Sequence, residues 1–297
     1  MTFTSTVHRA VFLLSFSICS VLYICPGPAL AQDQEADEES RQIFAAEFLN
    51  ARPGGNSSRT SPARPTKNQV RPDLIGITLW QLRPAKANDD TQSRLLDHDG
   101  SSDALLVAER VSAETKFREG QKVRVSIESP RSGYLYVIDR EQYADGTFSE
   151  PYLIFPTLKI RDGDNAVTAG RLIEIPGQDD NPIYFKMKRS REDQVADVLT
   201  ILVTSQKIEN LALERKPLKL TTEQFARWEQ SWKAPTKRVE MANHASHTYT
   251  RAEKTAGANP ASLLGPNDPP PQTIYRVSSK PSDPIMLTIA LNYQPLQ

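Results

Sequence analysis

The chain has 297 residues with 36 basic and 36 acidic side chains, and its formal net charge at pH 7 is zero. This balance excludes the strongly basic composition with which many proteins bind nucleic acid or anionic lipid. The hydrophobic fraction of 38%, the 22 prolines and the mean hydropathy of −0.49 are low for a fully compact chain. We therefore expect one large or two small domains accompanied by linker or disordered segments.

Residues 1–31 have the features of a secretory signal peptide. A weakly basic start precedes an apolar stretch, and the segment ends in Ala29-Leu30-Ala31, a small-x-small cleavage site. An uncleaved membrane anchor is the alternative, because about 16 apolar residues nearly span a bilayer. The helix-breaking Pro26-Gly27-Pro28 favours cleavage. We therefore expect an exported protein, periplasmic or extracellular, with no membrane span after the signal is removed.

Both cysteines, Cys19 and Cys25, lie within this predicted signal peptide. The mature chain would then contain no thiol, which excludes disulfides, a cysteine nucleophile and a cysteine-based metal site. We expect the fold to be held by core packing alone.

Residues 32–73 are predicted to form a disordered arm, acidic over residues 32–40 and then a flexible linker rich in Pro, Arg, Gly and Ser. Between these two parts lies enough apolar surface for a short helix with one apolar face: Ile43, Phe44, Phe48 and Leu49.

From residue 74 to the end the pattern is typical of β-strands. In residues 122–128, Val123, Val125 and Ile127 alternate with polar side chains, which predicts one core-facing and one polar face. Similar runs recur between turn signals: 74–82, 104–111, 134–139, 151–156, 171–176, 183–189 and 198–205. Short strands at this spacing predict a mainly β fold, an antiparallel β-sandwich, with residues 104–206 as its core.

One α-helix is predicted to pack on this sandwich, over residues 221–232. Thr221 and Gln224 have the spacing of a capping box, and Phe225, Trp228 and Trp232 form one stripe along the helix. This stripe is typical of a buried helix face, and a platform for stacking sugars is the alternative. After a long polar loop over residues 233–272, two alternating segments predict a terminal hairpin over residues 273–293.

Several polar clusters were tested as metal or catalytic sites. His98, His244 and His247 lie in polar, loop-like surroundings, so neither a Ser-His-Asp triad nor a zinc site is predicted. Two acidic clusters resemble calcium loops only partly, because their glycine and glutamate positions do not fit. We interpret both as turns: Asp97, Asp99 and Asp103 around Gly100, and Asp162, Asp164 and Asn165. No cofactor is predicted.

Asp139, Glu141 and Glu150 flank a predicted central hairpin and could face one cleft. Paired carboxyls carry out glycoside hydrolysis, so a hydrolase acting on envelope glycans or peptides is one hypothesis. Charged residues at strand ends are more often surface residues, which favours a non-catalytic protein.

The central block resembles the bacterial domain-of-unknown-function family 4384 over about residues 104–206. The motifs that carry this resemblance are a "G-x-x-V-x-V" strand, a "GYLYV" strand, a turn leading to "LIFP", and an "N-x-V-x-A-G" segment before a strand ending in "IP". The matching residues are Gly120, Val123, Val125, Gly133 to Val137, Leu153 to Pro156, Asn165, Val167, Ala169, Gly170, Ile175 and Pro176. The resemblance implies an all-β extracytoplasmic domain, sometimes attached to caspase-like peptidases or to repeat and kinase modules, and it implies no catalytic residue.

Together these observations predict a non-catalytic binding protein of the bacterial cell envelope. Its partner would be an envelope protein or surface component, and the arm around Phe44 and Phe48 is a second place where another chain could dock. The charged turn "REQYADGTFSE" is the part most available to a partner. Its predicted contact residues are Arg140, Glu141, Tyr143, Asp145 and Phe148.

Overall fold

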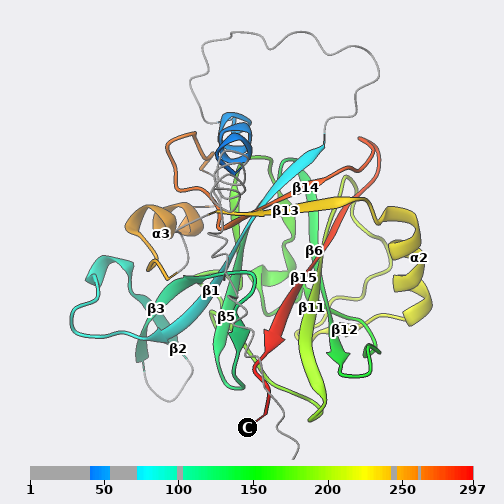
Figure 1. Ribbon diagram of the computed structural model, residues 1–297, viewed down its shortest axis with the longest axis horizontal. Coiled ribbons are helices and arrows are strands. Elements are labelled where there is room, and N and C mark those ends of the chain that lie inside the picture. The colour runs from blue at the N-terminus through cyan, green and yellow to red at the C-terminus, as the bar shows by residue number, and fades with distance from the viewer. Residues whose placement is uncertain (1–40, 54–71, 99–102, 242–245, 260–261, 297) are drawn as a thin grey trace, which may run out of the picture. The chain divides into compact units, whose positions relative to one another are not determined.

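The computed structural model describes residues 41–53, 72–98, 103–241, 246–259 and 262–296 (Figure 1). The predicted signal peptide lies outside these residues. The described part is mainly β and consists of two sheets that pack face to face, so the predicted sandwich is confirmed. Among the described residues, no helix is both long and apolar enough to cross a bilayer.

The first sheet follows the order β10-β5-β1-β14-β13. Beside this row, β3 pairs with β1, β2 pairs with β3, and β9 pairs with β5. Its pairs are all antiparallel. Its strands are β1 (Asp73–Pro84), β2 (Leu95–His98), β3 (Asp103–Val111), β5 (Lys122–Glu128), β9 (Leu172–Ile175), β10 (Phe185–Lys186), β13 (Thr236–Glu240) and β14 (Thr273–Val277).

The second sheet follows the order β12-β7-β6-β11-β15-β4, and β8 pairs with β6. The short β4 is parallel to β15, and the other pairs are antiparallel. Its strands are β4 (Lys116–Phe117), β6 (Gly133–Tyr143), β7 (Tyr152–Phe155), β8 (Ala166–Val167), β11 (Gln194–Thr204), β12 (Leu218–Lys219) and β15 (Ile285–Tyr293).

The core lies between the sheets and follows the predicted alternation. Val123, Val125 and Ile127 of β5 face it, and so do Leu135 and Val137 of β6. Since side chains alternate along a strand, Tyr136 and Ile138 of β6 face outward. They are nevertheless buried, because a helix covers that outer face.

That helix is α2 (Thr222–Trp232), the predicted packed helix. The Thr221 side chain accepts a hydrogen bond from the Gln224 backbone N–H at 3.1 Å, which satisfies one of the free donors at the helix start. Phe225 is buried against the outer face of the second sheet, and Trp228 and Trp232 pack partly buried beside it. The apolar stripe therefore packs on the sheet through Phe225, while Trp228 and Trp232 remain partly exposed.

The predicted polar loop and the predicted disordered arm both contain regular structure. The predicted loop 233–272 contains β13 and a second helix, α3 (Arg251–Ala258), capped by Thr250 and Glu253. Within the predicted disordered arm, residues 41–50 form the short helix that their apolar residues indicated, and its Phe48 is only 4% exposed, so this part of the arm is packed on the fold. In Figure 1, α2 and α3 lie on opposite sides of the paired sheets. The short turns η1 (Thr91–Ser93) and η2 (Arg161–Gly163) complete the elements.

The predicted terminal hairpin is wrong. β14 pairs with β1 and β13 in the first sheet, whereas β15 pairs with β11 and β4 in the second. The connection between β14 and β15 therefore crosses from one sheet to the other. Period-two alternation identifies a strand and its buried face, but it does not identify the strand's neighbour.

Candidate functional site

The predicted partner-contact turn joins β6 to β7, which pair as a hairpin. Gly146 has a φ of +83°, a left-handed conformation that glycine adopts without strain. The Asp145 carboxylate accepts hydrogen bonds from the Thr147 backbone N–H at 2.9 Å and from its hydroxyl at 2.6 Å. Asp145 is exposed, but its carboxylate is engaged in holding the turn.

Arg140 is fixed on the outer side of this hairpin. Its guanidinium lies 4.6 Å from the ring centroid of Phe148 and 4.3 Å from that of Phe225. One of its nitrogens lies 2.8 Å from a carboxylate oxygen of Glu229 on α2. Phe148 is 41% exposed, so one face of this stacked arrangement is open to solvent.

Glu141 and Tyr143 point to the other face of β6, because they alternate with Arg140. The Tyr143 hydroxyl donates to the Glu141 carboxylate at 2.9 Å, and the Ser190 hydroxyl also donates to it. The Arg191 guanidinium covers the Tyr143 ring at 3.9 Å. Burial, together with the Glu141 carboxylate, raises the pKa of Tyr143. The five predicted contact residues therefore lie on two faces of the hairpin.

The three carboxylates of the hydrolase hypothesis also separate. Asp139 and Glu141 share the inner face of β6, and Asp197 of β11 lies directly opposite Glu141 in the strand register. Glu150 instead forms an exposed ion pair with Lys219 of β12. The carboxyl cluster is therefore Asp139, Glu141 and Asp197. The sequence analysis did not single out Asp197. The signal that could have identified it is a carboxylate within a largely apolar strand.

Burial and the neighbouring carboxylates raise the pKa values of Asp139 and Asp197. Burial raises the pKa of Asp139 well above its usual value, and the charges of Asp197 and Glu141 raise it further. Burial also raises the pKa of Asp197, to about 6, although Tyr293 and Gln194 donate hydrogen bonds to its carboxylate at 2.8 and 2.6 Å. Such closely placed carboxyls titrate as a group and can donate a proton near neutral pH.

The polar clusters tested for metals serve other contacts in the described residues. Asp97 is buried and lies 3.0 Å from the Lys122 ammonium, and the Asn165 amide donates to the Leu135 carbonyl at 3.0 Å. Asp162 has a φ of +52° in a tight turn, where Arg161 pairs with Asp164. Asp99, Gly100, His244 and the side chains of His98 and Asp103 lie outside the described residues. No group of three or more His, Cys, Asp or Glu in the described ranges could hold a metal ion.

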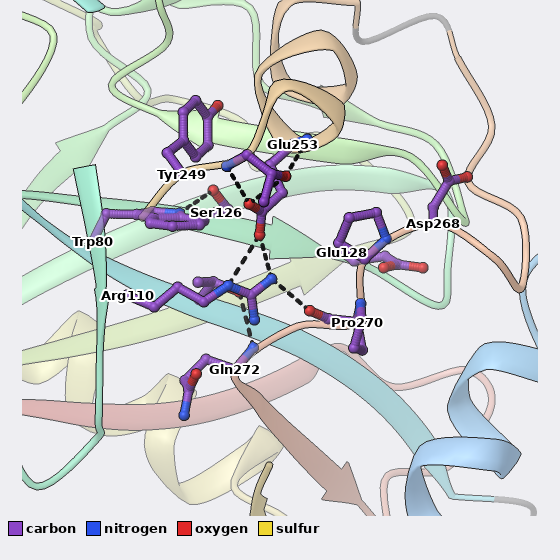
Figure 2. A network of polar contacts seen from close by, with 12 residues as sticks. Trp80, Arg110, Ser126, Glu128, Tyr249, Glu253, Asp268, Pro270 and Gln272 are labelled. Carbon is purple, nitrogen blue, oxygen red and sulfur yellow. Dashed lines mark hydrogen bonds and ion pairs between the residues drawn. The ribbon is translucent and has the colours of Figure 1, made fainter. Parts of the chain in front are cut away.

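A charged layer lies on the outer face of the first sheet and was missed by the sequence analysis. Figure 2 shows Arg110 of β3 reaching Glu253 of α3, with Trp80 and Tyr249 stacked edge to face beside them at 4.8 Å. The Trp80 indole donates to the Ser126 hydroxyl at 2.7 Å. Three buried ion pairs form this layer: Arg52–Glu128, Arg110–Glu253 and Arg124–Glu174.

The alternating polar side chains of β5 were predicted to form a polar face opposite the core-facing one. They are buried because residues 246–249 hydrogen-bond alongside β3 and α3 packs above the sheet, which covers this face. Tyr249 donates to the Glu174 carboxylate, and burial raises the pKa of Tyr249 well above 10. Because each charge has a partner within the fold, we interpret the Arg110–Glu253 and Arg124–Glu174 pairs as structural.

Searches of protein-family models, curated proteins and solved structures found no match to this chain. The resemblance to family 4384 therefore stays a prediction, and the function has to be argued from the geometry.

Proposed function

We propose that this protein is an exported, non-catalytic binding protein of the bacterial cell envelope. Its partner is an envelope protein or surface component, and it is recognised through a surface formed by the β6–β7 turn and α2. This α2–turn surface consists of Arg140, Phe148, Trp228, Glu229 and Trp232.

The observation that carries this proposal is the fixed stack of Arg140 between Phe148 and Phe225. Trp228 and Trp232 lie stacked on the same helix, with ring centroids 5.6 Å apart. Arg, Trp and aromatic residues are enriched at the centres of protein interfaces. A side chain that is already held in one conformation loses less entropy on binding, so the ordered stack favours a binding role.

Export is supported by the signal-like residues 1–31. The zero net charge gives no support to nucleic acid as the partner.

In-cell crosslinking of the tagged full-length protein, followed by mass spectrometry, tests the proposal. We expect one dominant crosslinked partner, which is lost in a Phe148→Ser variant. A Leu105→Ser variant is the matched control, because Leu105 is 46% exposed on β3 of the other sheet. Equal recovery of the partner by both variants would remove the α2–turn surface from the proposal.

The carboxyl cluster favours a second candidate, a hydrolase of envelope glycans or peptides. The raised pKa values of Asp139 and Asp197 suit a general acid, and the Asp139 Oδ1 atom is buried without a hydrogen-bond partner among the described residues. Replacing Asp139 and Asp197 together by asparagine should abolish hydrolysis of peptidoglycan fragments and leave partner crosslinking unchanged. A Glu150→Gln variant serves as the control, since Glu150 lies apart and pairs with Lys219.

A further inference from the structure

Residues 41–53 dock on the first sheet as a short amphipathic segment. Phe44 and Phe48 are four positions apart and therefore lie on one helix face. Phe48 packs against Leu74 of β1 and Ile274 of β14, and all three are buried. The apolar half of the predicted arm is thus occupied within its own chain.

Arg52, directly after this helix, enters a complete arginine pocket. It is 5% exposed, and its Nε and Nη2 atoms donate to the Glu128 carboxylate at 2.9 and 2.8 Å. Nη1 donates to the carbonyl oxygens of Gly265 and Asp268 at 3.0 and 2.8 Å, and Nη2 also donates to that of Pro269 at 3.0 Å. All five N–H donors of a guanidinium are used, which a lysine could not reproduce.

Two glycines make room for the segment. A Cβ on Gly76 would lie 2.7 Å from the Phe48 ring, and a Cβ on Gly170 would lie 2.2 Å from the Pro53 ring. Both distances are shorter than real contacts allow, so any side chain at either position would displace the segment. We call the surface formed by Gly76, Glu128, Gly170 and the three carbonyl groups the arginine seat.

The contact between the segment and the sheet is not sealed. A cavity of about 470 Å³ runs between them and is lined from the segment by Glu47, Phe48 and Arg52. Glu128 and Gly170 line it from the sheet side. The apolar contacts of the segment form a cluster separate from the core between the sheets, so the segment can leave without opening that core.

We propose that the arginine seat is a binding site for this helical Phe-x3-Phe-x3-Arg-Pro segment, and that residues 41–53 of one copy can occupy the seat of a second copy. The structure demonstrates a fit for this segment, and every copy carries both the segment and the seat. Residues 54–71 separate Pro53 from Pro72, and 18 residues reach about 60 Å when extended. This length permits both binding within a chain and binding to a neighbour.

Binding within one chain is favoured in dilute solution, because a connection of only 18 residues holds the segment near its own seat, at an effective concentration on the order of 1 mM. Exchange between copies is therefore best observed when each chain's own pair is weakened. An Arg52→Ala chain retains an intact seat, and a Glu128→Gln chain retains an intact segment. The native Arg52–Glu128 contact can form in the mixture only between the two chains.

The experiment mixes these two variants as chains that begin at residue 32, after the predicted signal peptide. Native mass spectrometry and light scattering measure the mass of the complexes that form. We expect a one-to-one heterodimer that is about tenfold or more tighter than the self-association of either variant. The double variant Arg52→Ala/Glu128→Gln lacks both intact parts and should stay monomeric. A monomeric mixture of two folded variants would overturn the proposal.

A second measurement covers the case in which a single variant loses its fold. The otherwise unchanged chain receives a protease site within residues 56–62, is cut, and is mixed with a fluorescent peptide of residues 38–54. Uptake of this peptide, but not of its Arg52→Ala form, supports an exchangeable segment. Unfolding on cleavage, or no uptake within a day, would show that the segment is a permanent part of the fold and would overturn the proposal.

Discussion

Gly133 shows at the residue scale how the absence of a side chain permits a close contact. It begins β6, and a Cβ at this position would lie 2.1 Å from the Thr204 carbonyl oxygen of β11. Gly120 also has a positive φ, +87°, but no atom lies within 4 Å of the corresponding position. Glycine is therefore required at position 133 because a side chain would clash, and is favoured at position 120 only because of its backbone conformation.

A Gly133→Ala substitution should lower the free energy of unfolding by about 3 kcal/mol or more, since the backbone of β11 must move. Gly120→Ala should cost only about 1 kcal/mol, the strain of a left-handed alanine. Urea unfolding of both variants measures the difference. Equal losses would mean that β11 yields easily at Thr204.

Protonation of the carboxyl cluster should also affect stability. The pKa of Asp197 is about 6 in the folded protein against an ordinary value of 3.8, so the folded state holds this proton more tightly than the unfolded state. Its contribution to the free energy of unfolding therefore rises as the pH falls through about 6 and stops rising below about 3.8. We expect a gain on the order of 3 kcal/mol over this range.

Thermal unfolding of the wild type and of an Asp197→Asn variant between pH 7.5 and pH 4, in about half-unit steps, isolates this contribution, because the other titrating groups are common to both. The free energy of unfolding of the variant minus that of the wild type should be largest at pH 7.5. It should shrink on acidification, because only the wild type gains stability by protonating Asp197. A difference that does not change with pH would show that the pKa of Asp197 is not raised in the folded protein.

At the element scale, α2 depends on both its cap and its buried stripe. Thr221 satisfies a backbone donor at its start, and Phe225 anchors it to the outer face of the second sheet. Arg140 and Glu229 add an ion pair between the helix and β6. The helix thereby positions most of the α2–turn surface.

A Thr221→Ala substitution should cost about 1 kcal/mol of stability, the usual loss on removing an N-cap hydrogen bond. Thr222→Ala is the control, since Thr222 is exposed inside the helix and should change stability by less than about 0.5 kcal/mol. Chemical denaturation followed by circular dichroism measures both. A loss in the control equal to that in Thr221→Ala would place the effect outside the cap.

At the scale of the whole molecule, the charged layer joins segments that are far apart in sequence. Arg124 and Glu174 are both fully buried and lie 3.0 Å apart, and Tyr249 and Gln178 also donate to Glu174. Leaving one such charge without its partner costs more than the intact pair contributes.

A Glu174→Gln substitution should therefore lower the free energy of unfolding by about 3–5 kcal/mol. The double variant Arg124→Met/Glu174→Leu should recover much of that loss, because neither charge is then buried alone. Urea unfolding at pH 7 compares the two. A double variant that is less stable than Glu174→Gln would mean that the layer depends on the charges themselves.

Local patterns determined the elements of this protein. Alternation along β5 identified its core-facing side chains, and the apolar stripe after Thr221 identified α2. These properties depend on residues that are neighbours in sequence. Side chains return to the same face about every 2 residues along a strand and about every 3.6 residues along a helix, so the pattern can be read locally.

Only the tertiary structure decided how the elements pair and what covers them. It separated β14 and β15 into different sheets, buried the polar face of β5 beneath α3, and brought Asp197 opposite Glu141. It also placed Arg52 on Glu128, 76 positions away. Such contacts depend on packing between distant segments, and a polar side chain has the same local pattern whether it faces water or a buried partner.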